Sequence, residues 1–226
     1  MKWIGHRGAA GLVAENTLES IAKALSYPIS GIEIDVHCCK SGEVVVIHDN
    51  TLDRTTNGRG EIAEYTLTQL KKITTREGFA IPTLIEVLEL IDARCQLNIE
   101  LKGNGTAKPV VALLETFVQK TDWSYGDFIL SGFDHRQLYE VHKLQPRFRI
   151  GVLTEENIRT VLSVAEGLNA FSIHPPILSL TRKDVKKARA KGYKVFVWTV
   201  NTKKQIEQCK LWNVDGIITD FPNFAV

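Results

Sequence analysis

The side chains of this sequence that could carry out chemistry stand within or directly after short apolar segments. They are two imidazoles, three carboxylates and two basic groups, namely His6, Arg7, Glu33, Asp35, His48, Glu100 and Lys102. Side chains two positions apart in a β-strand share a face, so Glu33 is expected to point with Asp35. Charged groups among apolar neighbours are costly unless they pair or bind a metal. These residues therefore predict a functional site.

The three acids predict a site for one hard divalent cation. Carboxylates that converge repel one another, and Mg²⁺ or Ca²⁺ relieves this repulsion because both cations prefer oxygen ligands. A transition metal would more often recruit cysteine or histidine. The alternative is that the acids only form ion pairs with Arg7 and Lys102. The sequence does not distinguish Mg²⁺ from Ca²⁺.

Two histidines, a cation and two basic side chains together suit the cleavage of a phosphodiester. The metal, Arg7 and Lys102 would neutralise the anionic oxygens of the ester, and the planar guanidinium matches phosphate. Of His6 and His48, one would accept a proton from the attacking oxygen and the other would protonate the leaving alkoxide. Imidazole suits both tasks because it titrates near neutrality. Which histidine is the acid stays open.

Eight short β-branched segments alternate with longer helical patterns. The predicted strands span 2–7, 31–36, 96–102, 128–133, 148–153, 169–174, 194–200 and 215–220. The predicted helices span 17–26, 82–93, 107–120, 135–144, 155–166, 181–191 and 202–211. Eight strands joined by crossover helices indicate an α/β protein with a (β/α)8 TIM-type barrel. A doubly wound open sheet is the alternative, although no GxGxxG motif follows the first strand.

In such a barrel the C-terminal ends of the strands form the active site. Most of the candidate residues stand at those ends. Trp198 and Phe133 are expected there as well, as an apolar wall against a small substrate. For Trp198 a place in the core is the alternative.

A hairpin is expected to bring His48 to the acids. The segment EVVVIHD (43–49) follows the second strand closely, and Ser41 with Gly42 predicts a two-residue turn. Directly opposed residues of a hairpin lie roughly 5 Å apart. With this turn, Asp35 is expected opposite His48.

The polar stretch after this hairpin is predicted to be a small insertion at about 50–81, with one short helix near 67–73. Long loops in compact domains are usually functional. The length of 226 residues fits a single barrel domain spanning 1–226.

Composition argues against several classes of protein. A net charge of +2 without a basic run argues against nucleic-acid binding. No apolar run approaches the length of a membrane span, and no leader peptide is evident. The four cysteines, without a CxxC pair, are expected to be free thiols in a reducing cytoplasm. The oligomeric state stays open.

Several motifs resemble the glycerophosphodiester phosphodiesterase family, in a compact bacterial form. They are HRGAAGLVAENTLESIAKAL, GIEIDVHCCKSGEVVVIHDNTLDRTTNGRG, PTLIEVL, NIELK, VWTVN and DGIITDFP, from His6 to Pro222. The family commonly has proline where Ala14 stands, threonine at Cys39 and aspartate at Ser41. None of these departures removes a group with a proposed role in catalysis.

The resemblance implies a barrel that hydrolyses glycerophosphodiesters to sn-glycerol 3-phosphate and an alcohol, with a place in lipid and glycerol metabolism. It also implies roles for individual residues. These are His6 and His48 as the acid/base pair, Arg7 and Lys102 as phosphate contacts, and Glu33, Asp35 and Glu100 as ligands of one divalent cation. The preferred alcohol and the formation of a cyclic phosphate intermediate stay open.

Two other functions compete with this one. A lysophospholipase D-like hydrolase would need an apolar groove for an acyl chain, which the sequence does not locate. A non-catalytic phosphoester-binding barrel would be expected to lack a histidine or a carboxylate, and here all five are present.

Overall fold

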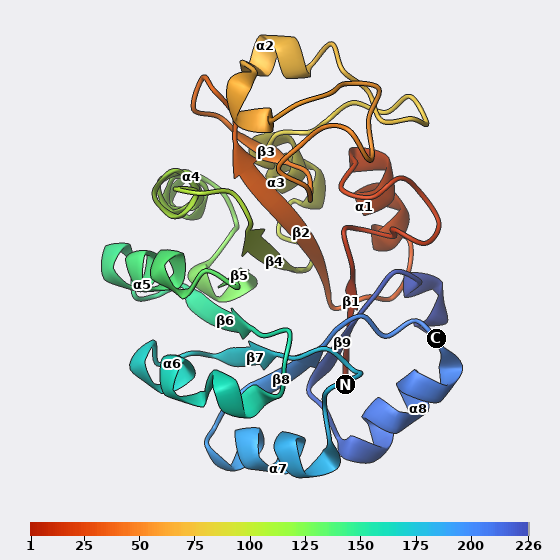
Figure 1. Cartoon of the computed structure of the whole chain (residues 1–226), viewed down its shortest axis with the longest axis vertical. Coiled ribbons are helices and arrows are strands. Elements are labelled where there is room, and N and C mark those ends of the chain that lie inside the picture. The colour runs from red at the N-terminus through yellow and green to blue at the C-terminus, as the bar shows by residue number, and fades with distance from the viewer. Residues whose placement is uncertain (226) are drawn as a thin grey trace.

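A closed barrel of eight parallel strands forms the centre of the computed structural model, which describes residues 1–225 (Figure 1). The strands follow the order β1, β9, β8, β7, β6, β5, β4 and β2, and β1 pairs with β2 to close the barrel. Their bounds are β1 (Lys2–Gly5), β2 (Gly31–Cys38), β4 (Gln96–Leu101), β5 (Phe128–Gly132), β6 (Arg149–Leu153), β7 (Ser172–His174), β8 (Lys194–Val197) and β9 (Gly216–Thr219). The predicted (β/α)8 barrel is confirmed, and the doubly wound sheet is excluded.

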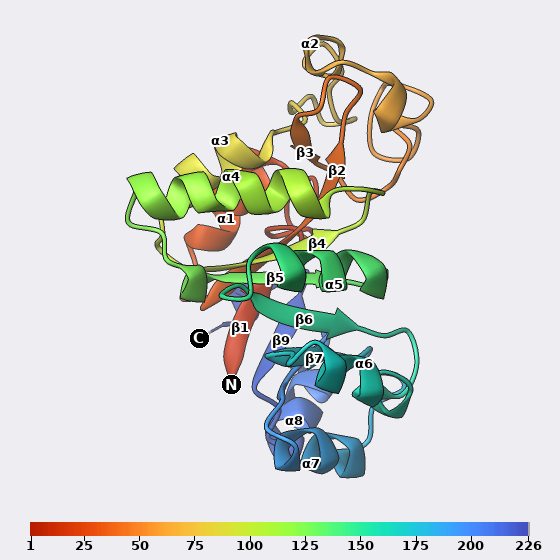
Figure 2. The same cartoon turned by 90° about the vertical axis from the view of Figure 1, so that its left-hand side faces the viewer.

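Helices cover the outside of this barrel (Figures 1 and 2). They are α1 (Leu18–Leu25), α3 (Leu84–Ile91), α4 (Ala107–Lys120), α5 (His135–Leu144), α6 (Leu162–Gly167), α7 (Arg182–Ala190) and α8 (Lys203–Trp212). The short α2 (Leu67–Leu70) lies away from the barrel, beyond the hairpin of β2 and β3 (Val44–Val46). None of the helices in residues 1–225 combines the length and the apolar character that a membrane crossing needs.

Strand residues alternate between the helix layer and the barrel interior. In β2, Ile32 and Ile34 are fully buried in the main core against the helices, so Glu33 and Asp35 point inward. A separate apolar cluster from four other barrel strands comprises Ile4, Ile129, Phe196 and Ile218. The barrel is thus a packed core, and the acids of β2 are held among buried residues.

The β2–β3 hairpin corrects the predicted register. The N–H of Ile47 donates to the carbonyl oxygen of Asp35 (3.0 Å), so Ile47 lies opposite Asp35 and His48 does not. The reason is the turn, which contains three residues, 40–42, instead of two. Gly42 adopts a left-handed conformation there (φ 99°), as such three-residue loops require.

Several predicted elements are shorter than expected, among them the strands predicted at 169–174 and 194–200, which span Ser172–His174 and Lys194–Val197. The strand predicted at 43–49 pairs only over Val44–Val46. The helix predicted at 155–166 is a single 3-10 turn, Ile158–Thr160, followed by α6. The side chain of Asn157 accepts a hydrogen bond from the N–H of Arg159, so this cap starts the turn late and leaves residues 155–157 outside any helix.

The segment between β3 and α3 has its own hydrophobic cluster, shared with the hairpin. This cluster consists of Cys39, Val45, Ile47, Leu52, Ile62, Leu70 and Ile81. The short helix expected near 67–73 is α2, and its N-cap Thr66 forms a capping box with Gln69. The cluster fixes a long loop that would otherwise have few contacts.

Replacement of Gly8 by alanine is expected to lower the free energy of unfolding by about 2–4 kcal/mol, since Gly8 has φ +85° and an added Cβ would lie 2.5 Å from Ser20 Oγ. Ser20 Oγ holds the backbone on both sides of Gly8, through the carbonyl of Arg7 and the N–H of Ala9. Chemical denaturation measures the change. The control is Gly192→Ala, where φ is +90° and the Cβ meets nothing within 4 Å, with a cost of about 1 kcal/mol. Equal costs for the two variants would contradict the prediction.

Candidate active site

A cavity of about 250 Å³ lies at the C-terminal ends of the strands. The structure brings into its lining all of the predicted site residues except Asp35, namely His6, Arg7, Glu33, His48, Glu100, Lys102, Phe133 and Trp198. The lining also contains Asn98, Leu153, Glu155, Thr199 and Ile218, which the sequence analysis did not single out. Asp35 is 1% exposed and lies behind this lining, next to Glu33 and Glu100.

The three predicted metal ligands meet in space. Glu33, Asp35 and Glu100 are all buried, and each offers an oxygen within 4.8 Å of the others. Burial, followed by the charges of neighbouring acids, raises the pKa of Glu33 well above its usual value. The same causes raise the pKa of Glu100 to about 7. A buried set of oxygen donors that repel one another fits a hard divalent cation.

Two further contacts fix Asp35. Asn16, immediately before α1, donates from its side-chain amide to Asp35 Oδ2 (2.8 Å), and its carbonyl oxygen accepts from the Asp35 N–H (3.3 Å). Asn16 adopts a left-handed conformation (φ 57°), and Thr17 takes the N-cap position instead. The sequence analysis did not single out Asn16, so this role was missed.

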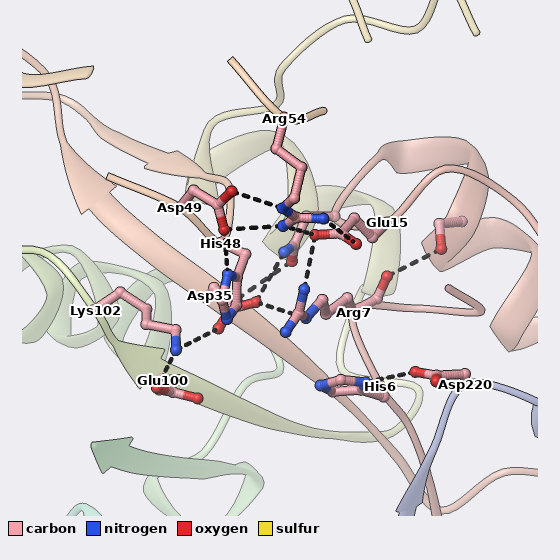
Figure 3. A network of polar contacts seen from close by, with 12 residues as sticks. His6, Arg7, Glu15, Asp35, His48, Asp49, Arg54, Glu100, Lys102 and Asp220 are labelled. Atoms are coloured by element: carbon pink, nitrogen blue, oxygen red, sulfur yellow. Dashed lines mark hydrogen bonds and ion pairs between the residues drawn. The ribbon is translucent and has the colours of Figure 1, made fainter. Parts of the chain in front are cut away.

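Arg7 stands between the acids and the outer loops (Figure 3). Its N–H donates to Glu33 Oε2 (3.0 Å), its Nη1 donates to Glu15 (2.7 Å), and its Nε lies 3.4 Å from Asp35 Oδ2. Burial lowers the pKa of Arg7, but the charges of Asp35, Glu15 and Glu33 outweigh burial, and the net pKa is raised. The guanidinium therefore stays charged at the cavity wall.

Lys102 supplies the second positive charge. Its Nζ lies 3.0 Å from Glu100 Oε1 and 4.0 Å from Asp35 Oδ1. The same ammonium lies over the ring of Phe133, 5.6 Å from its centroid. Lys102 and Arg7 are the two lysine or arginine residues in the cavity lining formed by residues 1–225.

An acid from the other end of the chain orients His6 (Figure 3). His6 Nδ1 lies 2.5 Å from Asp220 Oδ1, and Asp220 also accepts a hydrogen bond from the amide of Asn201 (2.5 Å). Burial raises the pKa of Asp220, but its bonds to His6 and Asn201 outweigh burial, and the net pKa is lowered. His6 Nε2 then points to the acids, 3.9 Å from Glu33 Oε2.

A second acid–imidazole pair holds His48. His48 Nδ1 lies 2.6 Å from Asp49 Oδ1, and both oxygens of Asp49 accept hydrogen bonds from Arg54 (2.6 and 2.9 Å). These bonds from Arg54 are the main reason that the pKa of Asp49 is lowered. Burial lowers the pKa of His48, with the charge of Asp35 opposing it. His37 Nε2 donates to the backbone carbonyl of His48 (3.0 Å) and so fixes its main chain.

These orienting residues were mostly missed by the sequence analysis. Asp49 adjoins His48 in the sequence, and this adjacency was a signal that could have been used. Asp220 is the last residue of the strand predicted at 215–220, and its partner is His6. Arg54 bonds Glu15 (2.7 Å), which in turn bonds Arg7, and no local pattern indicates such a contact.

Phe133 and Trp198 form the opposite wall of the cavity, as predicted from their strand-end positions. Their rings meet edge to face with centroids 5.9 Å apart. The indole N–H of Trp198 donates to the carbonyl of His174 (2.8 Å), which leaves the apolar ring facing the cavity. His174 itself is buried in the barrel and does not line the mouth.

Comparison with known proteins identifies the family. A model described as the glycerophosphoryl diester phosphodiesterase family matches residues 6–224. The chain belongs to this family. A glycerophosphodiester phosphodiesterase of Caldanaerobacter subterraneus is 37% identical, with 99% of this chain and 95% of that protein covered. One from Bacillus altitudinis is 36% identical, with 100% and 96% covered.

Solved structures of similar proteins share the barrel. An Oleispira antarctica phosphodiesterase, in complex with the product sn-glycerol-3-phosphate, has a TM-score of 0.89 and 27% identity, covering 100% of this chain and 95% of that one. A glycerophosphodiester phosphodiesterase from Thermotoga maritima has a TM-score of 0.82 and 31% identity, covering 99% and 96%. The predicted family and enzyme class, a phosphoric diester hydrolase, are confirmed.

Addition of Mg²⁺ or Ca²⁺ is expected to raise the melting temperature of the protein, because a cation that binds only the folded state stabilises it. Protons compete for Glu100, whose pKa is about 7, so the increase is expected to shrink as the pH falls from 8 to 5. Differential scanning calorimetry measures both effects.

Glu100→Gln is expected to abolish most of this increase. The exposed Glu89→Gln, on the outer face of α3, serves as the matched control and is expected to retain it. An unchanged metal effect in Glu100→Gln would remove Glu100 from the ligand set.

Proposed function

We propose that this chain is a divalent-metal-dependent phosphodiesterase that hydrolyses glycerophosphodiesters to sn-glycerol 3-phosphate and an alcohol by acid/base catalysis from two histidines. The observation that carries this proposal is that His6 and His48, each with its Nδ1 held by an aspartate, enter the same cavity as the buried acids. The product in the Oleispira antarctica complex, sn-glycerol-3-phosphate, supports the choice of substrate class.

Glu33, Asp35 and Glu100 would hold the cation. When bound, the cation supplies Lewis-acid polarisation of the phosphoryl oxygens. Because the acids and the two basic side chains, Arg7 and Lys102, lie at the same wall, the phosphate is expected to sit against that wall. Arg7 is fixed through Glu15 and Lys102 through Glu100, so neither needs to reorganise when an anion arrives.

His6 and His48 carry the proton transfers. An aspartate at Nδ1 leaves Nε2 of each ring to exchange a proton with the substrate, and it stabilises the imidazolium that forms. Figure 3 shows the two rings entering the site from different segments of the chain. One nitrogen activates the attacking oxygen and the other protonates the leaving alkoxide.

The size of the cavity supports a small diester over the lysophospholipid of the alternative hydrolase. About 250 Å³ accommodates glycerol, phosphate and a short alcohol. Hydrolysis of glycerophosphocholine and not of lysophosphatidylcholine tests this choice. The non-catalytic alternative is not favoured by any observation, since every proposed acid, base and ligand is present.

The proposal includes the remaining expectations from the sequence. The chain is one barrel domain over 1–226 with an insertion at about 50–81, and it acts on a small molecule without nucleic acid or membrane insertion. Cys38, Cys39, Cys95 and Cys209 are free thiols, which supports a reducing, cytoplasmic location.

His6→Ala and His48→Ala are each expected to lower kcat at least ~100-fold, since one proton transfer is typically worth 10²–10⁴-fold. Binding of sn-glycerol 3-phosphate is expected to survive in both variants, because the cation and the basic groups remain. The activity is measured as the turnover of a panel of glycerophosphodiesters, first after chelation and then with each metal restored. Unchanged turnover in either variant would remove that histidine from catalysis.

Asp49→Asn and Asp220→Asn are expected to lower kcat roughly 10- to 1,000-fold, and Asp49→Asn is also expected to move one limb of the pH–rate profile. Loss of the Asp49 charge lowers the pKa of His48 further, so the limb that His48 controls moves to lower pH. Asp220→Asn removes the carboxylate that orients the His6 ring, so its expected effect is the loss of kcat. The limb that Asp49→Asn moves identifies His48 as acid or base.

The matched control for these two variants is Asp122→Asn, an exposed loop position, for which neither kcat nor the profile is expected to change. If Asp49→Asn moved neither limb, the assignment of His48 to a proton transfer would be wrong, and unchanged turnover in Asp220→Asn would show that Asp220 is not needed to position His6.

A further inference from the structure

The cavity is divided by charge. Its β1, β2 and β4 side carries the imidazoles, the basic groups and the acids of the cation site. The other side is formed by residues that follow β5, β6 and β8, namely Phe133, Glu155 and Trp198. In the barrel β5 and β6 are neighbours, and β7 lies between β6 and β8. A phosphate bound on the first side would therefore direct one ester substituent toward this second wall.

Glu155 contributes a carboxylate to this wall. Within residues 1–225 its side chain has no hydrogen-bond or ion-pair partner, although it lines the cavity. The other acids around the mouth all have partners, namely Glu15, Glu33, Asp49, Glu100 and Asp220. The two basic residues of the cavity are likewise held by acids other than Glu155.

The loop that carries Glu155 is fixed on both sides. The N–H of Thr154 donates to the carbonyl of His174 (3.3 Å), and the Thr154 hydroxyl accepts from the N–H of Glu156 (3.1 Å). Asn157 donates to the buried Asp184 of α7 (2.8 Å). The carboxylate of Glu155 is therefore exposed on an anchored backbone.

Trp198 gives this wall an aromatic surface, whereas the ring of Phe133 already lies under the ammonium group of Lys102. The Trp198 backbone is tied to Pro175 and Ile177 (3.1 and 2.6 Å), and its indole N–H is tied to His174. The ring is thus held in place with an apolar surface toward the cavity. An aromatic surface next to a carboxylate attracts organic cations, quaternary ammonium groups above all.

We propose that Glu155, with the ring of Trp198, binds the ammonium group of the leaving alcohol. The inference rests on the proposed function and adds a substrate preference to it. The substrate is a zwitterion such as glycerophosphocholine or glycerophosphoethanolamine, with its phosphate on the basic side and its ammonium group on the Glu155 side. Diesters of uncharged alcohols lack the second contact and are poorer substrates.

The test compares kcat/KM for glycerophosphocholine, glycerophosphoethanolamine and glycerophosphoglycerol. Glu155→Gln preserves size and removes only the charge. It is expected to lower kcat/KM about three- to tenfold for the two ammonium substrates and to leave glycerophosphoglycerol within about twofold. Glu156→Gln is the matched control, since Glu156 is the exposed neighbour that does not line the cavity, and no substrate is expected to change.

Two outcomes would overturn the proposal. An equal loss on all three substrates would assign Glu155 to the shared glycerol moiety, and no loss would make it a solvated surface acid. Choline chloride gives a second measurement, because it is expected to inhibit the native enzyme and to inhibit Glu155→Gln about three- to tenfold more weakly. Failure of the proposed function would look different, since the native protein would then hydrolyse none of the three diesters.

Discussion

The repulsion among three buried carboxylates is the constraint on which the site depends. Glu33, Asp35 and Glu100 lie within 4.8 Å of one another, where burial and mutual charge raise the pKa of Glu33 and Glu100. The surrounding chain opposes this cost with Arg7 and Lys102, both within ion-pair distance of the acids. A bound cation would stabilise such a cluster. The same three acids would then affect both the stability of the fold and the chemistry of the site.

The same charges connect the barrel to the segment outside it. Glu15 bonds both Arg7 at the cavity wall and Arg54 of the insertion, and Arg54 holds the aspartate that orients His48. One chain of ion pairs thus links the cation site to the second imidazole. The insertion is therefore part of the active-site scaffold, and its hydrophobic cluster keeps Arg54 in reach.

The barrel separates two kinds of recognition because its strands carry different residues to opposite sides of one cavity. The β1, β2 and β4 side carries the three acids, the two basic groups and the two histidines proposed to transfer protons. The β5 to β8 side presents aromatic rings and Glu155. The ammonium group of Lys102 over the ring of Phe133 joins the two sides.

The sequence alone determined the barrel, the family and most of the lining of the cavity. Alternating strands and helices leave few folds, and strand parity places Glu33 with Asp35 regardless of loop detail. Tertiary structure decided the rest. The three-residue turn shifted the hairpin register, so His48 reaches the site past the strand end and not opposite Asp35. Asp220 pairs with His6 from 214 positions away, and Glu155 lines the cavity from a loop where a helix was predicted. Contacts between distant segments depend on packing, which no local pattern records.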